Sequence, residues 1–67
     1  MEFGNRLKEL LKEKEISQQT LATAIGVSQR AVSKWINFQA EPTESSIVNC
    51  AKFFGVSADY ILGLKDD

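Results

Sequence analysis

Apolar residues recur at helical rather than strand spacing along this chain. In the first segment they stand at i, i+4, i+7 and i+8: Phe3, Leu7, Leu10 and Leu11. This period places one apolar stripe on a helix over about residues 3–14, whose other faces are charged. No segment shows the apolar and polar alternation of a half-buried strand. The first element is therefore predicted to be an amphipathic helix.

Hydroxyl side chains and glycines divide the rest of the chain into four shorter helices. A hydroxyl oxygen accepts a hydrogen bond from an unpaired N–H of the first helical turn. Four residues are placed to do so: Ser17, Ser28, Thr43 and Ser57. Glycine ends a helix at the lowest cost, which favours stops at Gly26, Gly55 and Gly63. These signals predict helices over about residues 18–25, 29–37, 44–54 and 58–62, with a loop at 38–42, which holds the only proline.

Apolar residues at helical spacing within these helices define the expected core. They are Leu21, Ala22, Ile25, Ala31, Val32, Trp35, Ile36, Ile47, Val48, Cys50, Ala51 and Phe54. With 67 residues the chain has room for one domain, and a domain near this size buries only about 60% of its unfolded surface. We therefore expect an all-α fold, a compact five-helix domain spanning residues 1–67, with a short acidic end at 65–67.

Two of the short helices are joined in the manner of a helix-turn-helix, over about residues 17–37. Ala22 is small where the two helices approach most closely, and Gly26, four residues on, stands at a turn that needs a positive φ angle. Val32 and Trp35 hold the second helix against the core. In this motif the first helix crosses the DNA backbone and the second enters the major groove. Spacing alone leaves open a plain helical hairpin with Gly at its C-cap.

Several blocks of sequence, in order and at matching spacing, resemble one known family. The blocks are Arg6–Leu10, Ile16–Ala22, Ile25–Ser28, Val32–Trp35, Glu41–Pro42 and Ala51–Gly63. They resemble the helix-turn-helix domain of the phage repressors and Cro, the xenobiotic-response-element family, over about residues 3–63. The resemblance implies a lambda-repressor-like domain that binds pseudo-palindromic operator DNA as a homodimer and represses transcription in a bacterial cell or phage-infected host.

The resemblance also assigns residues to DNA contacts by position. Gln18, at the start of the second helix, would bond a phosphate, helped by the positive end of the helix dipole. The implied groove-facing positions are Ser28, Gln29, Arg30, Ser33 and Lys34. Their chemistry agrees, because Gln pairs bidentately with adenine and Arg with guanine. Asn37 would support the following loop or meet a phosphate. Without the resemblance, these residues fit equally well the solvated polar face of an exposed helix.

The chain departs from the family in the loop after the third helix. The family usually has Gly followed by basic residues there, whereas this chain reads Phe38-Gln39-Ala40-Glu41. Each lost cation lowers the slope of log K against log salt concentration by about 0.9, which predicts weaker and less salt-sensitive DNA binding.

Phe38, which lacks the conformational freedom of Gly, either folds back onto the core or contacts another subunit or protein. Phe38, Ile61 and Leu64 are the dimer-interface candidates. Glu15 also replaces a common Gly, so the first helix is expected to run on or end less sharply.

Charge and cysteine content narrow the chemistry further. Residues 1–35 carry six basic and four acidic side chains, a net charge of +2. Residues 36–67 carry two basic and five acidic side chains, a net charge of −3. Any anion-binding face therefore lies in the first half of the chain. One cysteine and no histidine exclude an intramolecular disulfide and a multi-ligand Cys/His site, and we expect no cofactor and no metal. No apolar run is long enough to cross a membrane, and a cytoplasmic protein is expected. No catalytic constellation argues for an enzyme.

Two functions remain. The first is a sequence-specific DNA-binding transcription regulator, a repressor that binds double-stranded operator DNA as a dimer. The second is a protein-interaction module of the same fold, resembling an antirepressor or antitoxin, with weak or no DNA binding. The missing basic loop favours the second function. The first is favoured by the surface made of Gln18, Gln29, Arg30 and Lys34.

Overall fold

The computed structural model describes residues 2–66, which form five helices and no strand. The helices are α1 (Phe3–Glu13), α2 (Gln18–Ile25), α3 (Gln29–Ile36), α4 (Glu44–Phe54) and α5 (Ala58–Ile61). Every predicted helix is present, and each bound lies within one residue of the predicted one. The all-α fold is thereby confirmed. Asp67, part of the expected acidic end, lies outside the described residues.

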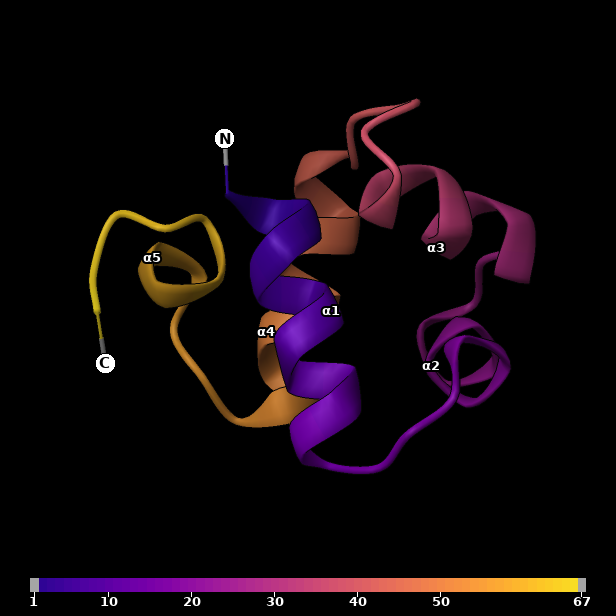
Figure 1. The fold of residues 1–67 in the computed structure, drawn as a ribbon, viewed down its shortest axis with the longest axis horizontal. Coiled ribbons are helices and arrows are strands. Elements are labelled where there is room, and N and C mark those ends of the chain that lie inside the picture. Colours follow the sequence, from indigo (N-terminus) through magenta and orange to yellow (C-terminus); the bar gives the residue numbers. More distant parts are fainter. Residues whose placement is uncertain (1, 67) are drawn as a thin grey trace.

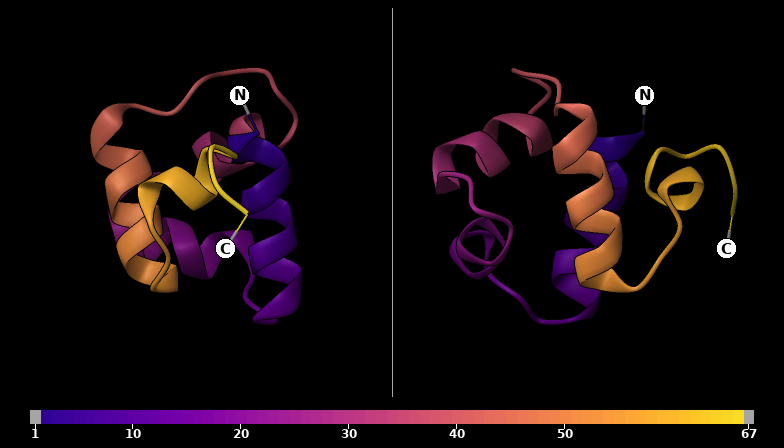
Figure 2. Two further views of the ribbon diagram at one scale, coloured as in Figure 1. Left: turned by 90° about the vertical axis from the view of Figure 1, so that its left-hand side faces the viewer. Right: turned by 180° about the vertical axis from the view of Figure 1, so that it is seen from behind.

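The helix-turn-helix occupies one flank of the molecule. α1 and α4 lie in the middle, with α2 and α3 on one side and α5 on the other (Figure 1 and Figure 2). α2 packs against α3 and α4, α1 packs against α3 and α5, and α4 packs against α5. The loop between α3 and α4 stands at the end of the molecule where α1 begins. This arrangement leaves the outer sides of α2 and α3 free of other helices.

Hydroxyl caps start four of the five helices, as the sequence predicted. In each, the side-chain oxygen accepts a hydrogen bond from the N–H three residues later, at 3.0–3.1 Å. The capping residues are Ser17, Ser28, Thr43 and Ser57. α1 begins after Glu2 without such a bond.

α1 ends at Glu13 because Glu15 adopts a left-handed backbone, with φ of 55°. The N–H of Ile16 then donates to the carbonyl of Leu11 at 2.9 Å, which closes the turn in the way a C-terminal glycine usually does. Gly26, with φ of 76°, does the same for α2. The expectation that α1 runs on or ends less sharply was therefore wrong. Packing of the segment after Glu15 imposes the conformation although Glu carries a Cβ.

The core is built from the predicted apolar stripes, with one exception on α4. Its fully buried members come from all five helices and are at most 1% exposed. They are Phe3, Leu7, Leu21, Ala22, Val32, Cys50 and Ile61. Cys50 is a core residue, as predicted. Val48 is 38% exposed, so placing it in the core was wrong. Its neighbour Ile47 packs against the core instead, and a helix turns through about 100° per residue, which carries Val48 to the edge of the buried face.

Candidate nucleic-acid interface

A three-residue turn fixes α3 relative to α2. The left-handed backbone of Gly26 allows the N–H of Val27 to donate to the carbonyl of Ala22 at 3.0 Å. Ser28 then caps α3, since its Oγ accepts from the N–H of Ala31 at 3.1 Å. The turn therefore ends one helix and starts the next within three residues.

Apolar side chains hold the inner face of α3 against the body of the domain. Val32 is fully buried and Trp35 is 6% exposed. The ring of Trp35 meets that of Phe3 edge to face, with centroids 5.8 Å apart and planes at 76°. Trp35 is thus a core residue, as predicted, and its ring is not free to stack on a base.

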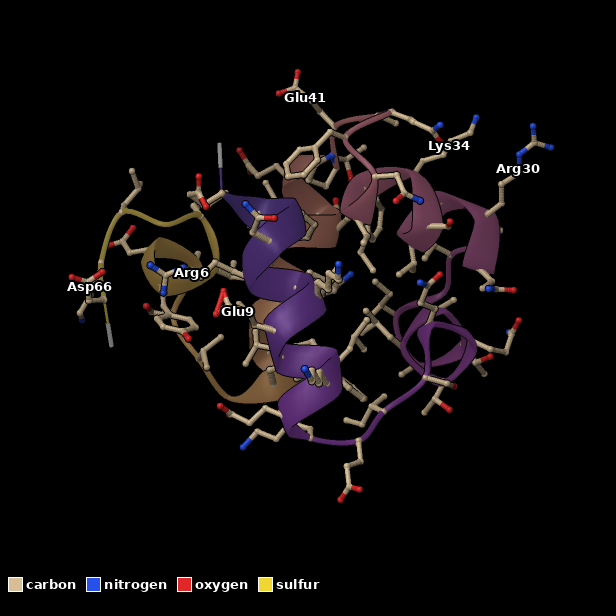
Figure 3. All side chains as sticks on the ribbon, viewed as in Figure 1. Arg6, Glu9, Arg30, Lys34, Glu41 and Asp66 are labelled. Atoms are coloured by element: carbon tan, nitrogen blue, oxygen red, sulfur yellow. The ribbon has the colours of Figure 1, made fainter. Side chains whose placement is uncertain are left out.

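The outer face of α3 carries the residues that the sequence assigned to DNA. Gln29, Arg30 and Asn37 are exposed, while Ser33 and Lys34 are half-buried. Figure 3 shows Arg30 and Lys34 extending away from the other helices. Their spacing of four residues puts both on one side of the helix. Within residues 2–66 neither takes part in an ion pair, so both positive charges remain available to a partner.

Several assigned side chains also make local hydrogen bonds. Besides the Ser28 cap, Ser33 Oγ accepts from Asn37 Nδ2 at 3.4 Å. A hydroxyl group that accepts a hydrogen bond can still donate its own proton, so Ser28 and Ser33 both remain able to bond a partner. Gln18 is the first residue of α2 and is half-buried. The assigned residues therefore lie at the start of α2 and on the outer side of α3, and their contacts with DNA stay a prediction.

The N-terminal ends of α2 and α3 keep their positive polarisation. The first turns of these helices contain no acidic residue, whereas those of α4 and α5 contain Glu44 and Asp59. Aligned peptide dipoles place about half a positive charge at a helix N-terminus. Together with Arg30 and Lys34, this favours an anion at the flank although the whole chain has a net charge of −1.

Phe38, in the loop after α3, folds back toward α1 while its ring stays largely exposed. Phe38 has φ of 59°, and the next N–H, of Gln39, donates to the carbonyl of Lys34 at 2.8 Å. The ring lies beside Gly4 of α1, where its Cε1 would be 3.3 Å from an added Cβ. It nevertheless remains 62% exposed. Phe38 therefore takes the positive φ angle usually given to Gly, and its ring covers the start of α1 without entering the core.

The structure separates the three dimer-interface candidates. Ile61 is completely buried within its own chain, so placing it at an interface was wrong, because α5 uses this side chain to pack on the core. Leu64 is 74% exposed and Phe38 62%. These two residues remain candidates for contact with a second subunit.

Sequence reasoning missed the roles of Gly4 and Arg6. A Cβ at Gly4 would collide with the carbonyl oxygen of Trp35, so this glycine allows α1 to approach the end of α3. The Arg6 guanidinium lies 4.6 Å from the Tyr60 ring centroid and 3.4 Å from Asp66. The hydrogen bond to Tyr60, followed by that to Asp66, raises the pKa of Arg6 above its usual value. A glycine inside a helical pattern is a signal for close approach, whereas nothing local marks Arg6.

The part of the chain that the structure describes offers little support for metal binding, a membrane-spanning helix or a reactive thiol. No group of three or more acidic, Cys or His side chains there is arranged to hold a metal ion. None of the helices formed by residues 2–66 is long and apolar enough to span a membrane. Burial raises the pKa of the Cys50 thiol to about 11, which keeps it protonated and unreactive near neutral pH.

Comparison with known proteins gives a consistent set of relatives. The transcriptional activator BcrR of Enterococcus faecalis is 37% identical over 62 residues, which cover 92% of this chain and 30% of BcrR. The solution structure of the DNA-binding domain of the P22 c2 repressor has a TM-score of 0.84 at 32% identity, covering 90% of this chain and 79% of that domain. The crystal structure of the P22 c2 repressor with a synthetic operator has a TM-score of 0.83 at 30% identity. The match covers 88% of this chain and 89% of the repressor chain in that structure.

The matched curated proteins are longer than this chain, which spans between 28% and 58% of their length. P22 is a phage of Salmonella, and its C2 repressor is among them. Residues 7–61 match the model of the helix-turn-helix family. The chain therefore belongs to the helix-turn-helix family of the phage repressor and Cro type.

Proposed function

We propose that this protein is a sequence-specific DNA-binding regulator of transcription that reads the major groove with α3. The observation that carries the proposal is the outer face of α3, where Arg30 and Lys34 point outward beside two helix N-termini that lack acidic residues. The solved complex of the P22 c2 repressor with an operator supports it, because that protein shares this fold at 30% identity.

Each residue of the surface has a distinct role in this proposal. Gln18 binds a phosphate from the start of α2, where the helix dipole favours an anion. Gln29 and Arg30 read base edges, since Gln suits adenine and Arg suits guanine, and Lys34 meets a guanine or a phosphate. Ser28, Ser33 and Asn37 add hydroxyl and amide contacts along the same side of α3.

We further propose that two copies bind a pseudo-palindromic operator and repress transcription by occluding a promoter. A two-fold dimer matches an inverted repeat because its two copies of α3 enter the major groove at two half-sites. The centres of these half-sites lie one helical turn, about 10 bp, apart. Phe38 and Leu64, the most exposed of the large apolar side chains among residues 2–66, are the residues that we propose join the two copies.

Selection from random duplex DNA tests this function directly. The protein is incubated with the pool at low salt, and the bound fraction is sequenced over several rounds. Enrichment of an inverted repeat supports a dimeric regulator, and enrichment of a single half-site supports a monomeric reader of DNA. If no sequence is enriched, the DNA-binding proposal fails and a protein-interaction module of the same fold becomes the better explanation.

Substitutions at the surface give the matched control. Arg30→Ala is expected to cost about 1–3 kcal/mol of binding and to relax the preference at one base pair. Lys52→Ala removes the same charge from an exposed position on α4 and is expected to leave the preferred sequence unchanged. Loss of sequence preference in both variants, or in neither, contradicts the role given to α3.

A further inference from the structure

A cavity of about 400 Å³ opens where the start of α1, the end of α3 and the loop 38–42 meet. Four of its lining residues carry apolar rings: the rings of Phe38 and Pro42 are accessible, whereas Phe3 and Trp35 are only 1% and 6% exposed. The backbone at Gly4 and the loop residues 39–41 complete the lining. Sites for small molecules in proteins are commonly about 300–1,000 Å³, apolar and aromatic, with a few polar groups. This cavity has the size and the composition of such a site.

Phe38 holds the cavity open at a cost in backbone conformation. A left-handed backbone is uncommon for any residue with a Cβ and a genuine outlier for a bulky one. Phe38 adopts it with φ of 59°, and its ring stays 62% exposed rather than completing the core. The exposed ring forms a wall of the cavity that lacks an apolar neighbour on its outer side.

Glu41 supplies the only charge among the residues that line the cavity. Its side chain stands at the outer end of the loop and extends away from Lys34 (Figure 3). Within residues 2–66 its carboxylate takes part in no ion pair. Aromatic rings and a free carboxylate together favour an organic cation, because an ammonium group is attracted both to ring faces and to the negative charge.

We propose that this cavity binds a small molecule that combines a hydrophobic ring with a single ammonium group. The ring of the ligand lies against Phe38 and Pro42, and the ammonium group lies at the mouth near Glu41. This site is separate from the outer face of α3, so its occupancy can be tested without DNA.

Trp35 provides the readout, because it is the only tryptophan of the chain and lines the cavity. Its fluorescence is followed during titration with 2-phenylethylammonium, with neutral 2-phenylethanol and with anionic 3-phenylpropionate. We expect saturable binding of the ammonium compound at millimolar concentration, about threefold weaker binding of the alcohol, and the weakest binding of the carboxylate. No saturable change, or equal binding of the three compounds, overturns the proposal.

Two variants test the walls of the cavity. Phe38→Gly removes the ring while relieving the backbone strain, so this variant is expected to fold at least as well and to bind the ammonium compound about tenfold more weakly. Glu41→Gln is expected to bring the affinity for the ammonium compound down to that for the alcohol. Val48→Ala, which trims an exposed apolar side chain that does not line the cavity, serves as the control and is expected to bind normally. Unchanged binding by folded Phe38→Gly protein overturns the proposal.

Discussion

Glu15 and Phe38 occupy a backbone conformation that glycine adopts with less strain. Three of the five helix ends use glycine for this purpose, and the sequence predicted those three because glycine is a local signal. The other two could not be predicted in the same way. A left-handed residue with a side chain is stabilised by contacts of the next segment, such as the hydrogen bond from Ile16 to Leu11, and these depend on packing across the domain.

Glu15→Gly is expected to stabilise the protein by about 0.5–1 kcal/mol. Relief of left-handed strain is worth about 1–2 kcal/mol, and the greater freedom of glycine in the unfolded chain offsets part of it. Thermal unfolding should show a rise in Tm of a few degrees for a domain of this size.

The control for this prediction is Glu15→Ala, which removes the carboxylate and keeps the Cβ. Its stability is expected to stay near that of the parent protein, because the backbone strain persists. A gain of equal size in both variants would assign the effect to the charge of Glu15 instead of its backbone.

Cys50 makes stability fall at alkaline pH. Burial raises the pKa of its thiol from 9.0 to about 11, so the native state holds this proton more tightly than the unfolded state does. The resulting stabilisation is complete below pH 9 and is lost as the pH rises towards 11, where the loss amounts to about 2 kcal/mol.

Urea unfolding of the parent and of Cys50→Ala at about pH 8 and about pH 11 measures this effect, since every contribution other than that of the thiol is common to both proteins and cancels. The variant is expected to be less stable at the lower pH and to lose about 2 kcal/mol less between the two. Parallel pH profiles would show that the thiol is not desolvated.

At the scale of helices, the sequence predicted the four starts capped by a hydroxyl group and the three stops at glycine, but not how the helices approach each other. Caps are signalled within three residues of the helix end, so Ser17 and Thr43 could be identified without any tertiary information. Contacts such as Arg6 with Asp66 join residues far apart in sequence and have no local mark. The position of Val48 at the edge of the buried face of α4 similarly depends on how α2 and α5 pack against that helix.

Gly4 sets the distance between α1 and α3. Its replacement by alanine is expected to destabilise the protein, although alanine usually stabilises a helix relative to glycine. Alanine usually stabilises a helix interior by about 1 kcal/mol relative to glycine. Gly4→Ala should instead destabilise the protein by about 1–3 kcal/mol, because the new methyl group collides with the carbonyl oxygen of Trp35 and forces the helices apart.

Gly26→Ala provides the comparison for that effect. An added Cβ at Gly26 meets no atom within 4 Å, so only the left-handed backbone, with φ of 76°, opposes it. The expected cost is about 1 kcal/mol. Urea unfolding of both variants separates the two mechanisms, and a Gly4→Ala protein more stable than the parent would show that α1 and α3 can move apart freely.

At the scale of the whole molecule, the candidate interface was more predictable than the cavity beside it. The interface residues, which the family resemblance assigned, lie in one continuous motif, and the buried Val32 and Trp35 determine which side of α3 faces outward. The cavity needs three separate segments, the start of α1, the end of α3 and the loop 38–42, to meet. Only the fold brings Phe3 to Trp35, so no pattern in the sequence could indicate it.

Glu41 gives the whole molecule a testable electrostatic property. It stands in the loop that follows α3, at the end of the domain from which Arg30 and Lys34 extend (Figure 3). If DNA binds along this surface, Glu41→Lys turns a repulsive contact with the phosphates into an attractive one. Each additional phosphate contact steepens the dependence of log K on log salt concentration by about 0.9. The variant should therefore bind DNA of any sequence more tightly at low salt and lose this advantage as salt rises.

Glu9→Lys is the matched control, because it makes the same change in net charge at an exposed position on α1. Charges in water are screened over about 10 Å at 0.1 M salt, so a lysine outside the interface should add little to the slope. Binding isotherms for both variants over a series of salt concentrations distinguish the two effects. A steeper slope for Glu41→Lys alone places the loop against the phosphate backbone. Equal slopes in the two variants would mean that net charge, and not the position of the loop, governs the interaction.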